Sequence, residues 1–344
     1  MTTIGRRDDD ALARGITSWC AQQWPGAAIA RVTFDRPNAG WSNETLLVTT
    51  GVTDGPPARF VVRLPPLVPT WPEYDLQAQA ALLDALQGEL PVPRVLAFEA
   101  DEQWLGAPFL VMTHESGTAG PEVPAFDAAI MDVSREAQRA LHETFVETLA
   151  RIHRIDWGVH ELDAVVRGGD ESSAPEVEWW REYVDWAADG SPTPALRDAI
   201  TWCAASVPAD EPPASLCWGD ARIGNVLFGP DREVTSVLDW ELATIGSAES
   251  DLAWYLVLDE VMTKFVKKTV PGFLDRAAFV AHYERALGRA VRDLEWHEIF
   301  ALARSVAINE RQARLAAEAG VSYPGVAGPD NPVLRILTRK IDRF

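Results

Sequence analysis

Residues 216–254 read LCWGDARIGNVLFGPDREVTSVLDWELATIGSAESDLAW, and a short β-hairpin organises this stretch. Two runs rich in apolar and β-branched residues, 225–228 and 234–238, flank the turn sequence Gly-Pro-Asp-Arg at 229–232. Glycine, proline and aspartate supply the backbone conformations of a tight turn, so the two runs are expected to pair as antiparallel strands. The hairpin then determines where the polar residues at its ends lie.

Three polar residues are expected to meet at one end of this hairpin. Asn225 on the first strand falls roughly opposite Asp239 on the second, and Asp220 lies five residues earlier on a loop short enough to fold back. Such oxygen ligands suit magnesium, while a carboxylate that does not bind the metal can orient a hydroxyl and accept its proton. Singly, these are ordinarily turn or capping residues; together, their spacing predicts a phosphoryl-transfer site.

Short β-rich runs precede residue 113, and long helical patterns follow it. Strands are predicted at 29–34, 45–50, 59–64, 95–99 and 109–113. Helices are predicted at 74–86, 134–155, 176–188, 195–206, 249–266, 275–288 and 293–318. The resulting α+β outline is a small lobe over 1–113, a linker over 114–120 and a larger, mainly helical lobe over 121–344.

The composition indicates a folded protein that acts away from nucleic acid and membranes. The chain has 344 residues, 47% of them hydrophobic, and a formal net charge of −20, which repels phosphate backbones and anionic lipid surfaces. Its three cysteines are far apart, so neither a disulfide framework nor a zinc site is expected. No signal peptide or membrane span is evident. We expect a cytoplasmic, soluble protein; its oligomeric state is left open by the sequence.

Several segments on both sides of the hairpin carry a resemblance to a known family. They are CWGDARIGNVLF at 217–228, VLDWELA at 237–243, DLAW at 251–254, NAGWSNETLLV at 38–48, FVVRLPP at 60–66, YDLQAQ at 74–79, LPVPRVLA at 90–97 and LGAPFLVM at 105–112. Together they resemble the aminoglycoside phosphotransferase / choline kinase-like superfamily. That resemblance implies a bilobal, protein-kinase-like fold with a small antiparallel-β lobe containing one helix and a larger, mainly helical lobe.

The resemblance implies a role for each polar residue near the hairpin. Asp220 corresponds to the catalytic aspartate that accepts the proton of the substrate hydroxyl, and Asn225 and Asp239 correspond to magnesium ligands. Asp251 corresponds to an aspartate at the start of a helix that supports the catalytic loop, although a plain N-cap is an equally good interpretation. The implied cofactors are ATP or GTP and Mg2+.

The resemblance also implies nucleotide-binding residues in the N-terminal lobe. The turn at 38–44 would lie over the phosphates, but it holds a single glycine and by itself equally fits an ordinary hairpin turn. Arg63 stands where the family has a phosphate-binding lysine, and Gln79 where it has the glutamate that pairs with that lysine. The implied set is Arg63, Gly40, Ser42, Asn43, Gln79, Thr113 and Glu115, the last two bordering the backbone that would bind the base.

Several other residues allow more than one interpretation. Trp218 stands where the wider superfamily has a histidine, so packing would position the catalytic loop. Arg222 fits a phosphate contact or a surface role, and His153 is better interpreted as a buried packing histidine than as a catalytic one. The helix at 176–186, EVEWWREYVDW, fits either a substrate pocket or a helix core.

The predicted function is transfer of the γ-phosphate of ATP or GTP to a hydroxyl group of a small molecule. Candidate acceptors are hydroxyacyl-CoA thioesters, amino alcohols and aminoglycosides; the charge of −20 favours a cationic acceptor, whereas 72–79 and 105–112 resemble the acyl-CoA branch. One alternative, motivated by Trp218, Arg63 and Gln79, is a nucleotide-binding pseudokinase that regulates a partner protein. Another is a metal-dependent hydrolase using the same carboxylates.

Overall fold

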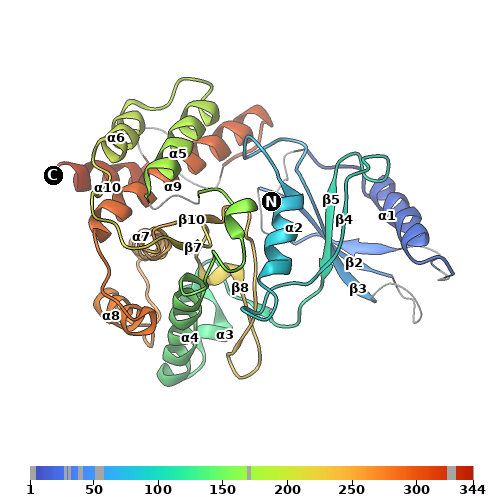
Figure 1. Cartoon of the computed structure of the whole chain (residues 1–344), viewed down its shortest axis with the longest axis horizontal. Coiled ribbons are helices and arrows are strands. Elements are labelled where there is room, and N and C mark those ends of the chain that lie inside the picture. The colour runs from blue at the N-terminus through green and yellow to red at the C-terminus, as the bar shows by residue number, and fades with distance from the viewer. Residues whose placement is uncertain are drawn as a thin grey trace. The chain divides into compact units, whose positions relative to one another are not determined.

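The computed structural model describes residues 5–26, 29, 32–37, 42–50, 58–168, 172–323 and 331–343, and these form two compact units (Figure 1). The β-rich unit takes its described residues from Met1–Asp84, Pro93–Glu115 and Glu310–Gly325. The helical unit takes them from Ala85–Val92, Ser116–Asn309 and Val326–Phe344. Each unit therefore combines segments that are distant in sequence, and neither unit is one continuous range of residues.

The sheet of the β-rich unit is antiparallel, and its strands follow the β-branched runs of the sequence. Its order over the described residues is β1-β2-β3-β5-β4. The strands are β1 (Thr33–Asp35), β2 (Glu44–Thr49), β3 (Arg59–Leu64), β4 (Val95–Glu99) and β5 (Phe109–Thr113). β2 to β5 match the predicted strands to within one residue. β1 begins later than the predicted 29–34, of which residues 30–31 lie outside the described part.

Two helices precede residue 86 in the part of the chain that the structure describes, although the sequence patterns predict only one there. The predicted helix at 74–86 is α2 (Leu76–Ala85). The additional helix, α1 (Asp9–Gln23), lies beside the sheet in Figure 1. Its Trp19 packs edge-on against Phe109 of β5 with 5.4 Å between ring centroids, so burial of this aromatic face stabilises a helix whose sequence begins with a run of charged residues.

Long helices make up most of the remaining chain, and those predicted from periodicity are present to within two residues at each end. They are α4 (Arg135–His153), α5 (Ala174–Ala187), α6 (Pro194–Ala205), α7 (Glu249–Val266), α8 (Arg276–Leu287) and α9 (Leu294–Glu318). The short α3 (Ala128–Met131) and the C-terminal α10 (Pro332–Ile341) are not predicted. α4 and α8 lie side by side (Figure 1).

The predicted hairpin is present. Two further short strands, one before it and one after it in the sequence, pair with each other. The strands are β7 (Ser215–Cys217), β8 (Val226–Phe228), β9 (Val234–Val237) and β10 (Thr244–Gly246), with β6 (Thr118–Ala119) beside β8. β8 pairs with β9, and β7 pairs with β10. Strands of three residues are too short to show periodicity, which is why the β7–β10 pair escapes prediction.

The register of the hairpin differs slightly from the predicted one. Val226 pairs with Val237, and the N–H of Leu238 donates to the carbonyl of Asn225 at 2.8 Å. Asn225 therefore faces Leu238, and Asp239 follows one residue later. The bulge between Leu227 and Phe228 shifts the pairing along the strands, which the turn sequence alone does not reveal.

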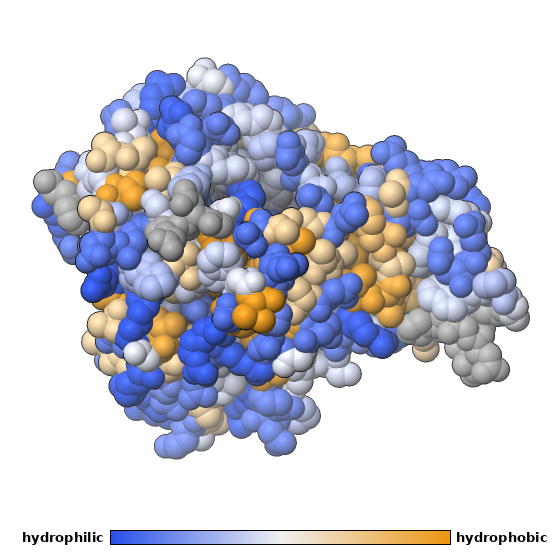
Figure 2. Space-filling model, in the orientation of Figure 1, coloured by the Kyte–Doolittle hydropathy of each residue, from blue (hydrophilic) through white to orange (hydrophobic). Residues whose placement is uncertain are grey.

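The surface follows the polar, acidic composition of the chain. The face drawn in Figure 2 is mostly hydrophilic, with apolar residues gathered in several patches between polar ones. Across the residues that the structure describes, none of the helices combines the length and the apolar character of a membrane span. Cys20, Cys203 and Cys217 are all buried and have free thiols.

Candidate active site

The carboxylate of Asp220 is oriented by hydrogen bonds from three described side chains. Its Oδ1 accepts from Nε1 of Trp254 at 2.8 Å. Its Oδ2 accepts from Nδ2 of Asn225 at 2.8 Å and from Nε of Arg222 at 2.9 Å. The Asp220 side chain is 18% exposed, so it is held by the protein and still reachable from solvent. The predicted proximity of Asp220 and Asn225 is thus present in the structure.

Asn225 is oriented so that its amide oxygen is available to a ligand. The residue ends the short 3₁₀ turn Ile223–Asn225, and its Nδ2 donates to both the carboxylate and the backbone carbonyl of Asp220. Because the amide nitrogen is committed to Asp220, Oδ1 is turned away from that residue. Asp239 follows Leu238, the residue that faces Asn225, and carries a second carboxylate at this end of the hairpin. The backbone of Asp239 has a φ of 62°, in the left-handed region. Amide and carboxylate oxygens of this kind fit magnesium.

Arg222 connects the carboxylates around the hairpin. It forms ion pairs with Asp220 and Glu122. Burial opposes its charge, but the carboxylates of Asp220, Glu122 and Asp239 outweigh burial and raise the pKa of the guanidinium. Arg222 therefore remains positive and offsets part of the negative charge gathered here. Of its two predicted interpretations, a plain surface role does not describe this residue.

Asp251 supports the backbone of the loop at 218–225. Its carboxylate accepts hydrogen bonds from the N–H of Trp218 at 2.5 Å and from the N–H of Gly219 at 2.8 Å. The Asp251 side chain is 1% exposed, so no water molecule can take its place as acceptor for the two backbone N–H groups. Because α7 begins two residues earlier, Asp251 acts on the loop and is not the N-cap of its own helix.

His153 extends this support to α8. Its Nε2 lies 3.0 Å from Oδ2 of Asp251, and its Nδ1 lies 2.6 Å from the hydroxyl oxygen of Tyr283. The side chain is buried and both ring nitrogens have partners, as expected for a packing histidine. A chain of buried contacts thus connects α8 and α4 through Asp251 to the loop at 218–225.

Close packing holds the same loop from another side. Trp218 is fully buried, and its Nε1 donates to the carbonyl of Leu238 at 2.8 Å. Gly219 has a φ of 90°, and a Cβ at this position would lie 2.2 Å from the carbonyl oxygen of Leu242. Only glycine fits there. Packing and one indole N–H therefore position the loop where the wider superfamily uses histidine, as the sequence predicts.

Arg304 of α9 contacts the loop but is not singled out by the sequence patterns. It is 2% exposed and donates from Nη2 to the carbonyl of Gly219 at 2.9 Å. Its guanidinium carbon lies 4.8 Å from the ring centroid of Trp254, and Nη1 lies 3.5 Å from a carboxylate oxygen of Glu176. A single arginine within the apolar run IFALARSVA at 299–307 is the signal that indicates a buried cation.

Trp254 also contacts the loop and is given no role by the sequence patterns. It follows Asp251 by three residues in α7, so both side chains share one face of the helix. From that face Asp251 accepts from the loop backbone, while the indole of Trp254 donates to the Asp220 carboxylate. The D-x-x-W spacing is a local signal that could have identified this pair.

The predicted nucleotide-binding residues lie on the sheet and on α2 of the β-rich unit. Arg63 is on β3 and half-buried, and Gln79 lies in the first turn of α2. Thr113 ends β5, and its hydroxyl donates to the carboxylate of Glu115. The predicted contact between Arg63 and Gln79, and the roles of all four residues, stay predictions.

The predicted phosphate-binding turn is described only in part. Ser42 and Asn43 directly precede β2, so they lie at the start of a strand of the sheet. Gly40 lies outside the described residues. The assignment of this turn to phosphate binding also stays a prediction.

The aromatic helix α5 already has a cation of the protein against it. The guanidinium carbon of Arg167 lies 3.6 Å from the ring centroid of Trp179, which stacks on Tyr183 with 5.6 Å between centroids. Burial lowers the pKa of Arg167 to about 10, which leaves the guanidinium charged at neutral pH. Tyr183 is 1% exposed. The structure therefore favours the helix-core interpretation over a cradle for a cationic substrate.

The comparison with protein families agrees with this geometry. The model of the phosphotransferase enzyme family matches residues 33–300. The chain belongs to this family. As a member of the phosphotransferase enzyme family, it has the α+β, kinase-like fold that the sequence resemblance implies.

Relatives of this phosphotransferase include both longer proteins and solved structures of similar length. Acyl-CoA dehydrogenase family member 11 of Gallus gallus is 30% identical over 255 residues, which are 72% of this chain and 31% of that protein. The chain thus spans about a third of the length of that curated relative.

Two solved structures share the fold of this phosphotransferase. One, from Ralstonia eutropha and assigned as an aminoglycoside phosphotransferase, superposes with a TM-score of 0.70 at 21% identity, covering 98% of this chain and 99% of that chain. The other is the GDP complex of aminoglycoside 2′-phosphotransferase-IIIa, with a TM-score of 0.59 at 16% identity and coverage of 96% and 98%.

Proposed function

We propose that this phosphotransferase transfers the γ-phosphate of ATP or GTP to a hydroxyl group of a small molecule in a magnesium-dependent reaction. The observation that carries the proposal is the oriented Asp220 carboxylate, with the amide of Asn225 bonded to it and Asp239 at the end of the same hairpin. Membership of the phosphotransferase enzyme family supports the reaction class.

Asp220 would orient the acceptor hydroxyl through one particular oxygen. A carboxylate offers about four lone-pair sites over its two oxygens. Asn225 and Arg222 both donate to Oδ2, whereas Oδ1 accepts from Trp254 alone among the described residues. The remaining site lies on Oδ1, so we assign the hydroxyl, and later its proton, to Oδ1. The indole of Trp254 would fix the direction from which the hydroxyl approaches.

Asn225 and Asp239 would hold the magnesium ion through Oδ1 of the amide and through a carboxylate oxygen. When bound, magnesium neutralises charge that builds up on the transferred phosphoryl group. Arg222 serves a different purpose, because its guanidinium is engaged by the carboxylates of Asp220 and Glu122 and holds them in place.

The β-rich unit would bind the nucleotide. We assign the phosphates to Arg63, Ser42 and Asn43 together with Gly40, and the base to the backbone near Thr113 and Glu115. A guanidinium on β3 suits this role because its planar fork binds phosphate oxygens in pairs. The GDP complex of a structural relative supports a guanine nucleotide as one candidate donor.

The acceptor belongs to one of three classes: a hydroxyacyl-CoA thioester, an amino alcohol or an aminoglycoside. The name of the Gallus gallus relative supports the first class, and those of the solved structures support the third. The net charge of −20 favours a cationic acceptor. Arg167 already occupies the aromatic face of α5, so a cationic acceptor would have to be recognised by carboxylates elsewhere.

The test is a mass-spectrometric transfer assay with ATP and GTP over these acceptor classes, followed by the Asp220→Asn variant on the acceptor found. We expect Asp220→Asn to retain nucleotide affinity and to lower kcat by a factor of about 10² or more. The matched control is Asp231→Asn, in the exposed turn of the hairpin, which should behave as the parent. Parental turnover by Asp220→Asn would contradict the assignment. Magnesium-dependent nucleotide binding without transfer would support the pseudokinase alternative.

A further inference from the structure

Gly219 directly precedes Asp220, the proposed acceptor of the hydroxyl proton. The loop requires glycine at this position, because a Cβ would lie 2.2 Å from the carbonyl oxygen of Leu242. Glycine has no side chain to restrict its backbone, so its dihedral angles stay fixed only if other groups hold the neighbouring peptide units. A rotation at Gly219 would turn Asp220, the next residue in the chain, away from its substrate.

Two buried groups of opposite charge hold Gly219 on either side of its Cα. The carboxylate of Asp251 accepts from the N–H of Gly219 at 2.8 Å, and Nη2 of Arg304 donates to its carbonyl at 2.9 Å. The N–H belongs to the peptide plane before the Cα and the carbonyl to the plane after it, so the two contacts together restrain φ and ψ. Both side chains are buried, so water does not compete for either contact.

The guanidinium of Arg304 also reaches the side chain of Asp220, through the ring of Trp254. Its carbon lies 4.8 Å from the ring centroid of Trp254, within the range of a cation–π contact. Nε1 of the same ring donates to Oδ1 of Asp220 at 2.8 Å. Arg304 therefore acts on Asp220 by two routes, the backbone of Gly219 and the indole of Trp254.

Arg304 is in turn held by two residues of the aromatic helix α5. Oε1 of Glu176 lies 3.5 Å from Nη1 of Arg304, and the ring centroid of Trp180 lies 4.8 Å from its guanidinium carbon. Glu176 and Trp180 are themselves buried. A guanidinium that has lost its water needs a counter-charge of this kind to stay in one place. Through Arg304, α5 is thus connected to the loop at 218–225.

We propose that Arg304 is a positioning residue, which fixes the direction of the Asp220 carboxylate through Gly219 and Trp254, and that Glu176 holds Arg304 in place. A guanidinium suits this role because its fork can donate to a carbonyl, pair with a carboxylate and lie against aromatic rings at the same time. Apolar residues can often replace a buried ion pair without loss of stability, so stability alone does not account for a charge here. The effect on turnover rests on the proposed function; the restraint on the loop does not.

The kinetic test is Arg304→Met, which keeps an unbranched apolar side chain but removes the donors and the charge. We expect kcat to fall about tenfold to a hundredfold, as for a misplaced catalytic group, with KM within about twofold of the parent. Arg304→Lys keeps the charge and a donor, so it should recover part of the loss. Glu176→Gln should lower kcat less. The double variant Arg304→Met/Glu176→Gln should be no slower than Arg304→Met, because Glu176 acts through Arg304.

The matched control is Arg311→Met, at a second buried arginine of α9. Arg311 is 8% exposed, and its Nη2 donates to the carbonyl of Pro69 at 2.7 Å, so it also has a backbone acceptor, but one outside the loop. We expect both variants to lose stability and only Arg304→Met to lose kcat. Equal changes of kcat in the two variants, or a loss of kcat/KM carried by KM alone, would overturn the proposal.

Amide hydrogen exchange of the full chain separates this proposal from the proposed function, because it needs no transfer reaction. Amides of the loop at 218–225 should exchange at least about tenfold faster in Arg304→Met than in the parent or in Arg311→Met, while those of α6 are unaffected. If Arg304→Met does not fold, Arg304→Lys allows the same comparison with a smaller change. Unchanged exchange of the loop would overturn the proposal. A parent that transfers no phosphate, with the expected exchange in the variants, would contradict only the proposed function.

Discussion

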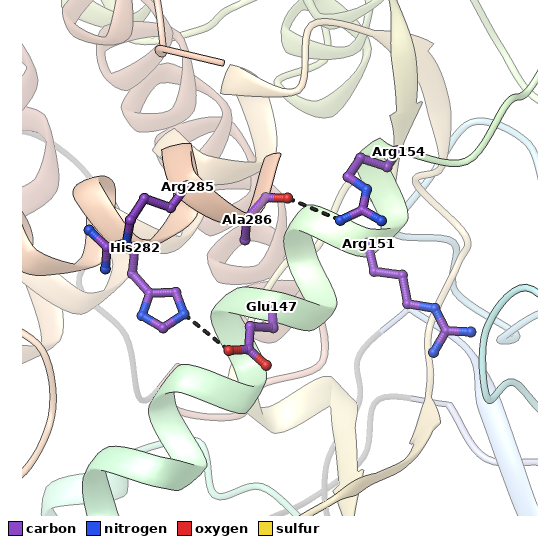
Figure 3. A pocket seen from close by; sticks show the side chains of 6 residues that line it. All are labelled: Glu147, Arg151, Arg154, His282, Arg285 and Ala286. Atoms are coloured by element: carbon purple, nitrogen blue, oxygen red, sulfur yellow. Dashed lines mark hydrogen bonds and ion pairs between the residues drawn. The ribbon is translucent and has the colours of Figure 1, made fainter. Parts of the chain in front are cut away.

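The loop at 218–225 and the pocket between α4 and α8 use arginine in opposite ways. At the loop, Arg304 is 2% exposed and donates to a backbone carbonyl, and Arg222 pairs with two carboxylates. In the pocket between these two helices (Figure 3), Arg151 and Arg285 are exposed and lack such acceptors in the described ranges. A buried guanidinium requires acceptors because it has lost its water, whereas an exposed one keeps it. Buried arginines therefore fix the geometry of the loop, while exposed ones need no acceptor from the protein.

Asp251→Ala should have the largest effect, because Asp251 holds two backbone groups of the loop. The substitution leaves the buried N–H groups of Trp218 and Gly219 without their acceptor, which should lower the free energy of unfolding by about 2 to 6 kcal/mol. Chemical denaturation measures the change. The matched control is Asp275→Ala, which removes an exposed N-cap of α8 and should cost about 1 kcal/mol. Equal losses would show that Asp251 contributes no more than an ordinary cap.

Acidification should destabilise the protein through His142, a buried residue of α4. Burial lowers the pKa of His142 to about 3, and its Nδ1 accepts from the N–H of Leu274 at 2.9 Å, a bond that protonation would break. Between that pKa and the unfolded value near 6.5, the unfolded chain binds a proton that the folded chain does not. Stability is therefore complete above about pH 6.5 and declines as the pH falls, by about 2 kcal/mol at pH 5.

The measurement is denaturation of the parent and of His142→Gln at several pH values. The variant lacks the titrating group, so its stability should decline less steeply between neutral pH and pH 5 than that of the parent. An unchanged slope in His142→Gln would refute the assignment. The experiment tests whether burial decides which charges the fold tolerates.

Trp254→Phe should have the smallest effect and isolates one hydrogen bond of the loop. The ring remains, but the donor to Oδ1 of Asp220 is lost, so the carboxylate is less well oriented. We expect kcat to fall about tenfold, equivalent to about 1.4 kcal/mol, with little change in KM. Trp296→Phe is the matched control, because its buried Nε1 has no hydrogen-bond partner among the described residues. A similar loss in both variants would indicate general damage to packing.

Features that depend on residues close together in the chain can be predicted from the sequence. The turn at 229–232 predicts the hairpin, and the five-residue interval between Asp220 and Asn225 predicts their contact. The observed register differs from the predicted one by one residue, because the turn sequence does not determine which residues of β8 and β9 pair. The β7–β10 pair and α1 escape prediction, since each is stabilised by partners that are distant in sequence.

The sequence by itself determined the phosphotransferase family, the antiparallel sheet, the main helices and the residues gathered at the hairpin. These follow from periodicity and short intervals, which fix local geometry before any tertiary contact forms. Only the tertiary structure decided that Asp251 and Arg304 hold the loop from positions 32 and 85 residues away from Gly219, and that Arg151 and Arg285 share one pocket. Such contacts form between helices whose packing is set by the whole core, so no local pattern encodes them.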